Sequence, residues 1–150
     1  MITGSRKAAH GGKVIGRMAN PSELLFDTTA LIDIYRGKDE IKSKFDSVLS
    51  GELIPYVSVI TEAELWRGMH VEELERHEMM LEQFISLPLD SDAARQAGMW
   101  MQKFAGSGLG WMDALIAATG KIAGLPVLTR DKRLATLLSA EAKFELYIPA

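Results

Sequence analysis

Residues 110–134 read GWMDALIAATGKIAGLPVLTRDKRL, and this stretch decides the fold. Its first part is predicted to be an apolar helix that ends at Gly124, because glycine readily takes the left-handed conformation that closes helices. LPVLT (125–129) is predicted to be a buried strand, and DKRLATLLS (131–139) a helix that Asp131 can cap. A strand enclosed between two helices is the repeating unit of a parallel sheet with both faces covered.

The rest of the chain shows the same alternation between short apolar runs and helical periods. Parallel strands joined through helices use right-handed crossovers, which place the helices on the faces of the sheet. We therefore predict an α/β fold with a mainly parallel central sheet of about five strands. The further predicted strands lie at 24–26, 55–60, 87–89 and 144–148, and the further predicted helices at 28–36, 40–49, 61–69, 71–86 and 90–104.

The composition indicates an ordinary globular domain. The chain has 150 residues, 47% of them apolar and 25% charged, which is typical of one domain with a single core. It has no cysteine, so disulfides and thiol chemistry are excluded, and we expect a reducing, cytoplasmic setting. No apolar run approaches the roughly 20 residues that span a membrane, and the first residues lack the apolar stretch of a secretory signal.

Charge divides the chain into a basic start and an acidic body. Residues 1–20 carry four of the 17 basic residues and none of the 20 acidic ones, so residues 21–150 carry 13 basic and 20 acidic residues, a net charge of −7. The first segment shows no regular period, and we expect a leader or an expression-derived tail, with Met18 as a candidate natural start. Residues 21–150 are expected to form the functional domain, and an acidic body needs local basic residues or metal ions to bind nucleic acid.

Four acidic residues stand where predicted strands give way to helices: Asp27, Glu64, Asp113 and Asp131. In a parallel α/β sheet, sites form outside the C-terminal ends of the strands, so these four carboxylates could meet in one crevice. Gathered there, they would repel one another unless a divalent cation held them together. The first hypothesis is therefore a metal-dependent hydrolase of phosphodiesters.

Each acid also has a simpler explanation as a residue at the start of a helix. Asp27 and Asp131 can act as N-caps. Glu64 closes the sequence TEAE (61–64), which matches a capping box. Asp113 lies in the first turn of an apolar helix, where the helix dipole favours an acid. The two explanations are compatible, because helix N-termini help to keep carboxylates ionised before a metal binds.

Three motifs surround these acids: LLFDTTALIDIYRG (24–37), SVITEAELWRG (58–68) and the stretch at 110–134. In this order they resemble the successive motifs of PIN-domain ribonucleases, most closely the VapC toxins of bacterial and archaeal toxin–antitoxin pairs. The resemblance covers roughly residues 23–148. It implies a three-layer α/β/α sandwich and an endoribonuclease that depends on Mg²⁺ or Mn²⁺.

The resemblance also implies a role for each acid. Asp27, Glu64 and Asp113 would hold the principal ion, and Asp131 would support that ion or a second one. Oxygen ligands suit these hard cations, and the bound ion would activate a water for attack on an RNA phosphodiester. Whether one or two ions bind stays open.

Four further residues are candidate substrate contacts. Arg36 and Arg130 could attract a phosphate, although Arg130 could instead pair with Asp131. Thr28 and Thr129 could hydrogen-bond a carboxylate or a metal-bound water.

The resemblance implies two protein partners besides the RNA substrate. One is a cognate antitoxin, whose basic side chain could enter the acidic crevice, and the other is a second copy of the chain in a homodimer. Two other functions stay open: a catalytically inactive PIN-like module that binds protein or RNA, and an RNA-processing nuclease without an antitoxin. A small companion reading frame immediately upstream would count against the last.

Other hydrolytic chemistry has little support in the sequence. There is no phosphate-binding P-loop and no nucleophile elbow. The histidines at positions 10, 70 and 77 lack the spacing of zinc ligands. His77 lies in a charged helical segment, and we expect it to be exposed.

Overall fold

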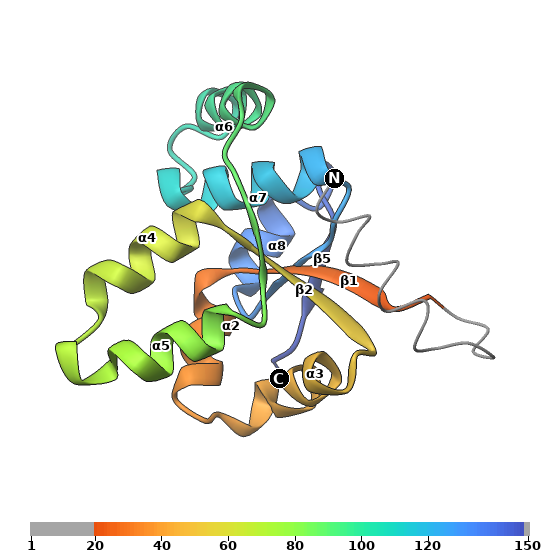
Figure 1. Cartoon of the computed structure of the whole chain (residues 1–150). Helices are drawn as coiled ribbons and strands as arrows, with labels where there is room; N and C mark the ends of the chain where they lie inside the picture. The colour runs from red at the N-terminus through yellow and green to blue at the C-terminus, as the bar shows by residue number, and fades with distance from the viewer. Residues whose placement is uncertain (1–19, 149–150) are drawn as a thin grey trace.

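A five-stranded sheet runs through the centre of the computed structural model, which describes residues 20–148 (Figure 1). The predicted leader at residues 1–20 lies outside the described residues except for Asn20. The strands are β1 (Ser22–Phe26), β2 (Leu53–Ser58), β3 (Ile85–Leu87), β4 (Val127–Thr129) and β5 (Phe144–Leu146). They pair in parallel throughout, in the order β3-β2-β1-β4-β5, which confirms the predicted fold class.

Helices connect the strands and cover both faces of the sheet (Figure 1). None of the helices within residues 20–148 has the length and apolar character to cross a bilayer. The helices are α2 (Thr28–Tyr35), α3 (Asp39–Ser50), α4 (Val59–Gly68), the 3-10 turn η1 (Val71–Glu73), α5 (Leu74–Leu81), α6 (Ser91–Lys103), α7 (Trp111–Ala123) and α8 (Lys132–Leu137).

The order of the strands reverses at β1, the central strand. From β1 the chain builds β2 and β3 on one side, and it then returns to place β4 and β5 on the other. In open α/β sheets, such a reversal leaves a crevice outside the C-terminal ends of the two strands that flank it. Here those strands are β1 and β4, and Asp27 and Asp131 follow them closely in the chain.

Two apolar layers hold the helices onto the sheet. Phe26 and Val57 face the side covered by α2, α3 and α5, and Leu25 and Tyr56 face the side where Ile116 of α7 packs. This alternation explains why the strands read as unbroken apolar runs, because a parallel strand is buried on both faces. α6 packs against the outer side of α7 through Trp100, which is only 1% exposed (Figure 1).

The predicted helix at 71–86 is wrong in its length. The helical segment ends at Leu81, and β3 lies at 85–87 rather than 87–89. Phe84 and Ile85 are both buried, and burying two consecutive side chains on opposite faces suits a strand rather than one helical face. Val71 is 86% exposed and does not reach the core.

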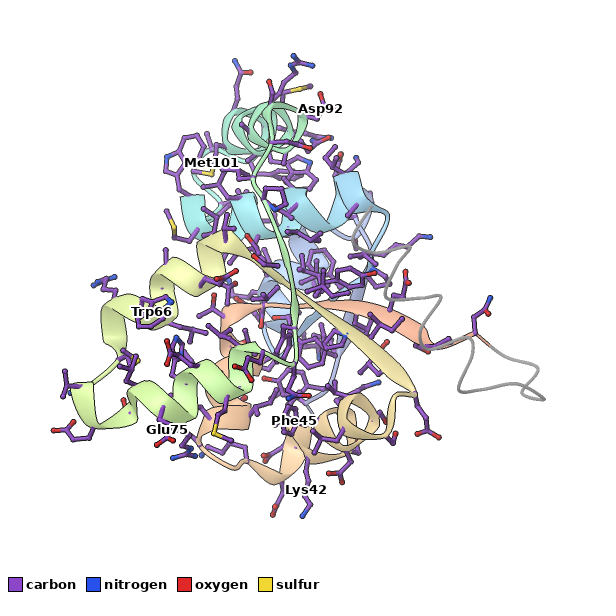
Figure 2. All side chains as sticks on the ribbon, in the orientation of Figure 1. Lys42, Phe45, Trp66, Glu75, Asp92 and Met101 are labelled. Carbon is purple, nitrogen blue, oxygen red and sulfur yellow. The ribbon has the colours of Figure 1, made fainter. Side chains whose placement is uncertain are left out.

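His77 is wholly buried, which corrects the expectation of exposure. It lies on α5 between two aromatic rings, with ring centroids 4.6 Å from Trp66 and 6.2 Å from Tyr35. Figure 2 shows Trp66 between α4 and α5. Within residues 20–148 neither ring nitrogen of His77 has a hydrogen-bond partner. The imidazole therefore acts as an aromatic packing group and carries the desolvation cost of two polar atoms.

Replacing His77 with phenylalanine is expected to raise the free energy of unfolding by about 1 kcal/mol, because the phenyl ring keeps the aromatic contacts and removes two unpartnered polar atoms. Urea unfolding measures the change. His77→Ala is the matched comparison, and it should lower the free energy of unfolding by about 2 kcal/mol or more because it leaves a cavity. A loss of stability in His77→Phe would show instead that the ring nitrogens are satisfied in solution.

Candidate active site

Asp27 starts the site directly after β1. Its Oδ1 accepts hydrogen bonds from the Ala30 backbone N–H at 2.9 Å and the Thr29 hydroxyl at 2.7 Å, which confirms it as the N-cap of α2. The side chain is only 5% exposed. Burial raises the pKa of Asp27, hydrogen bonds from Thr129, Thr29 and Ala30 lower it, and the charge of Asp131 raises it again, with a net upward shift.

Glu64 does not belong to a capping box, so this part of the sequence interpretation is wrong. α4 begins at Val59, because the Ser58 hydroxyl oxygen accepts a hydrogen bond from the Ile60 backbone N–H at 3.0 Å. Glu64 is therefore in the second turn of α4, and its orientation is set by tertiary contacts instead of by a local cap.

Thr28 supplies that contact from the first residue of α2. Its hydroxyl donates to Glu64 Oε1 at 2.5 Å and lies 3.0 Å from the hydroxyl oxygen of the buried Thr61. The predicted hydrogen bond from Thr28 to a carboxylate is confirmed. It ties Glu64 to the N-terminus of α2, the helix that Asp27 caps.

Asp113 and Asp131 approach the same edge from the helices on either side of β4. Asp113 is the third residue of α7, and its side chain is exposed. Asp131 caps α8 by accepting from the Leu134 backbone N–H at 3.0 Å, as predicted. Its own N–H donates to the hydroxyl oxygen of the buried Thr129 at 2.9 Å. The Thr129 side chain therefore contacts both the backbone N–H of Asp131 and the carboxylate of Asp27.

The pKa of Asp113 shows that the four acids share one electrostatic environment. Partial burial is the largest cause of the raised pKa, although Asp113 remains exposed to solvent. The charges of Asp131, Asp27 and Glu64 raise it further, in that order. The charges of three acids that are scattered in sequence therefore act on Asp113 in the folded protein.

The four carboxylates are suitable ligands for a hard divalent cation, but their side chains are not arranged around an ion in this structure. Oxygen donors of this kind suit Mg²⁺ or Mn²⁺, and a cation would relieve their repulsion. In the part of the chain that the structure describes, however, no group of three His, Cys, Asp or Glu side chains is placed to hold an ion. Glu64 and Asp131 each use one carboxylate oxygen in a hydrogen bond, and small side-chain rotations would be needed to close a site.

The two predicted phosphate contacts are not brought to the acids. Arg36 follows the last residue of α2, nine residues after Asp27, which places it about 13 Å along the helix axis from the acid. Arg130 donates from Nη1 to Asp33 Oδ1 at 3.3 Å and does not pair with Asp131. A role for either arginine in substrate binding therefore stays a prediction.

Asp33 and Tyr147 form a buried polar contact that the sequence interpretation missed. The Tyr147 hydroxyl donates to Asp33 Oδ2 at 2.6 Å, and Asp33 is 2% exposed. Burial raises the pKa of Tyr147, and the hydrogen bond to Asp33 and the charge of Asp33 raise it further. The available signal was a single acid in the otherwise apolar stretch ALIDIY (30–35), three residues after the buried Ala30 and so on the same helix face.

A pocket of about 470 Å³ opens beside Asp113 and Asp131. Its other walls come from the loop between α6 and α7 and from α8. Two cationic residues, Lys132 and Arg133, take part in the lining, so acidic and basic groups meet in one concave surface.

Comparison with known proteins identifies a family. Residues 24–137 match the family described as PIN domain. The search of curated protein sequences gave no match.

Solved structures share the fold over nearly their whole length. A DNA-bound VapBC from Salmonella typhimurium matches with a TM-score of 0.71 at 23% identity, over 85% of this chain and 99% of that chain. A toxin–antitoxin complex from Klebsiella pneumoniae matches with a TM-score of 0.67 at 24% identity, over 85% and 99%. VapBC-5 from Mycobacterium tuberculosis, a member of the VapBC toxin–antitoxin family, matches with a TM-score of 0.60 at 25% identity, over 84% and 98%.

Proposed function

The chain belongs to the PIN-domain family, and from this premise we propose that it is a metal-dependent endoribonuclease of the VapC toxin type. The observation that carries the proposal is the placement of the acids at the switch point of the sheet, where Asp27 directly follows β1, Asp131 closely follows β4 and Asp113 lies at the start of α7. Acids at the switch point of an α/β sheet, with the pKa of Asp27 and Asp113 raised, are characteristic of a functional site. We expect the activity in the cytoplasm.

In this proposal, Asp27, Glu64 and Asp113 hold a Mg²⁺ or Mn²⁺, and Asp131 supports the same ion or a second one. When bound, such an ion lowers the pKa of a water molecule and stabilises charge that develops on a phosphoryl oxygen. Asp27 and Asp131 cap α2 and α8, and Asp113 lies in the first turn of α7, where the helix dipole attracts negative charge. The Thr28 hydroxyl holds Glu64 in position.

The structural neighbours support a toxin with a protein partner, because several were solved as toxin–antitoxin or VapBC assemblies. We propose a cognate antitoxin that inserts a basic side chain among the acids, where a guanidinium would neutralise the charge that otherwise requires a metal. We also propose that the chain forms a homodimer.

One observation favours the alternative of a binding module without catalysis. Within residues 20–148 no three candidate ligands are arranged around an ion, and two of the four acids are already helix caps. The two functions differ in one test. The purified full chain is incubated with end-labelled single-stranded RNA in EDTA, and Mg²⁺ or Mn²⁺ is then added in excess. Cleavage that starts only after the ion is added supports the nuclease, whereas equal cleavage in EDTA or none with either ion would overturn it.

Asp27→Asn is expected to raise the melting temperature of the metal-free protein at pH 7. The pKa of Asp27 is higher in the folded protein than in the unfolded protein, so protonation of Asp27 stabilises the fold. This contribution is fully present below the unfolded-state pKa of 3.8 and is lost as the pH rises through the folded-state pKa. Asparagine keeps the helix cap and removes the charge. The gain should therefore appear at pH 7 and vanish at pH 3, and thermal melts at both pH values measure it.

Asp90→Asn is the matched control, because Asp90 also caps a helix by accepting a backbone N–H, that of Ala93 at 2.8 Å, and lies outside the acid cluster. Its melting temperature should shift little at pH 7. Added Mg²⁺ should stabilise the wild type and the Asp90 variant more than Asp27→Asn. If Asp27→Asn and Asp90→Asn respond alike to Mg²⁺, Asp27 is only a cap.

A further inference from the structure

The pocket beside Asp113 and Asp131 has features that the acids do not explain. Its volume of about 470 Å³ lies within the range of small-ligand sites, roughly 300–1,000 Å³. Any RNA phosphodiester placed at the acids would have its next nucleotide close to this pocket. Building on the proposed nuclease function, we infer that the pocket binds one nucleotide of the RNA strand next to the cleaved bond, with Arg133 holding its phosphate.

Arg133 is positioned for this role by the loop between α6 and α7. Its Nη2 donates to the Ser107 carbonyl oxygen at 3.2 Å. Gly108 takes the left-handed conformation with φ of +90°, and a Cβ at this position would lie 2.6 Å from Arg133 Nη2. The glycine therefore provides both the turn and the space into which the guanidinium fits.

The guanidinium retains hydrogen-bonding capacity toward the pocket. It has five N–H donors in a planar fork that suits phosphate oxygens, and its one hydrogen bond within residues 20–148 goes to a neutral carbonyl. In the same part of the chain, neither Lys132 nor Arg133 forms an ion pair, whereas Arg130 and Lys103 are paired with Asp33 and Glu141. Two unneutralised cations thus stand beside two acids, which allows an anionic strand to approach an otherwise acidic domain.

The remaining wall of the pocket is apolar. Leu109 from the loop and Leu137 from α8 are partly buried and line the pocket, together with the buried Leu134. Apolar side chains accept the face of any base without hydrogen-bond readout. The arrangement of a cationic phosphate contact and an apolar wall matches the two parts of a nucleotide, and it predicts weak preference for base identity at this position.

The test measures RNA binding and cleavage separately in the full chain. Binding of a fluorescent single-stranded oligoribonucleotide is measured by anisotropy in EDTA at several salt concentrations, and kcat and KM are measured in Mg²⁺ or Mn²⁺. The variants are Arg133→Ala, Arg133→Lys and Thr136→Trp, whose indole would fill the pocket without changing its charge. Arg95→Ala is the matched control, because Arg95 is exposed on α6 and forms an ion pair with the exposed Asp92 at 3.8 Å.

Arg133→Ala is expected to weaken binding about tenfold and to raise KM similarly, with kcat within about twofold of the wild type. The slope of log Kd against log salt should fall by about 0.7, the value for one phosphate contact on a single strand. Arg133→Lys should keep the slope and recover part of the affinity, Thr136→Trp should weaken binding at an unchanged slope, and Arg95→Ala should behave as the wild type.

The possible results separate this inference from the nuclease proposal. If the wild type cleaves RNA and both Arg133→Ala and Thr136→Trp bind and cleave as the wild type does, the pocket assignment is overturned and the nuclease stands. If the wild type cleaves no RNA with either ion but loses RNA affinity in Arg133→Ala, the nuclease proposal fails and the pocket is supported as an RNA-binding site.

Discussion

Asp113→Asn is expected to lower kcat/KM for RNA cleavage by about a thousandfold, or about 4 kcal/mol of transition-state stabilisation, while the protein remains folded. Asparagine has the shape of aspartate but lacks the charge that a divalent cation requires. Asp113 is exposed in the first turn of α7, so the fold does not depend on burying its side chain. Removing its charge also relieves repulsion from Asp131, Asp27 and Glu64, which offsets the lost interaction with the helix dipole.

Cleavage of end-labelled RNA in excess Mg²⁺ gives the rate, and thermal melts followed by circular dichroism verify the fold. Asp92→Asn is the matched control, because Asp92 is also an exposed aspartate in the first turn of a 13-residue helix, and it lies on the outer side of α6, away from the sheet (Figure 2). Wild-type rates in both variants would remove Asp113 from the mechanism. Sequencing of RNA ends after induced expression of the wild type and Asp113→Asn extends the comparison to cellular substrates.

The fold was predictable because its signals are local and repeated. A parallel strand buried on both faces requires a short apolar run, and four of the five predicted runs overlap β1, β2, β4 and β5, whereas the run at 87–89 shares only Leu87 with β3. Gly124 ended α7 in the left-handed conformation, as expected from the residue itself. Boundaries are wrong at 53–60, where β2 begins and ends two residues earlier than predicted, and at 71–87, where helical periodicity continues into a segment that the sheet recruits as its edge strand. Propensity in that segment yields to tertiary pairing with β2.

The setting of the candidate site residues was predictable only where an acid also has a local role in the fold. Asp27 and Asp131 are caps as well as members of the acidic cluster, so their positions followed from sequence. Glu64 was also named from the sequence, but its place in the helix was not, because Ser58 starts α4 three residues earlier than a cap at Thr61 would. The partner that orients Glu64 is Thr28, 36 residues away in the chain, and a contact of that separation has no local signal.

Arg130 and Arg133 illustrate the same limit. They lie three residues apart, and the sequence analysis named Arg130, beside Asp131, but not Arg133 as a candidate phosphate contact. The structure instead directs Arg130 to the buried Asp33 and places Arg133 in the lining of the pocket beside the acids. The assignment of roles therefore depended on Asp33, whose burial becomes evident only once α2 is packed on the sheet.

Arg130→Met is accordingly expected to lower the free energy of unfolding by about 2 kcal/mol and to leave RNA cleavage at 25 °C within about twofold of the wild type. The loss arises because the Asp33 side chain, 3% exposed, would keep only the Tyr147 hydroxyl as a partner within residues 20–148. It lies below the cost of breaking a fully buried pair because the Arg130 side chain is 42% exposed, and solvent screens its charge. Urea unfolding measures the loss.

The double variant Asp33→Asn/Arg130→Met should recover most of this loss, since asparagine still accepts the Tyr147 hydrogen bond and leaves no buried charge unpaired. If Arg130→Met instead has unchanged stability and a raised KM, Arg130 is a substrate contact. A residue that stabilises the fold must act through its pairing with Asp33, whereas a residue that binds the RNA need not.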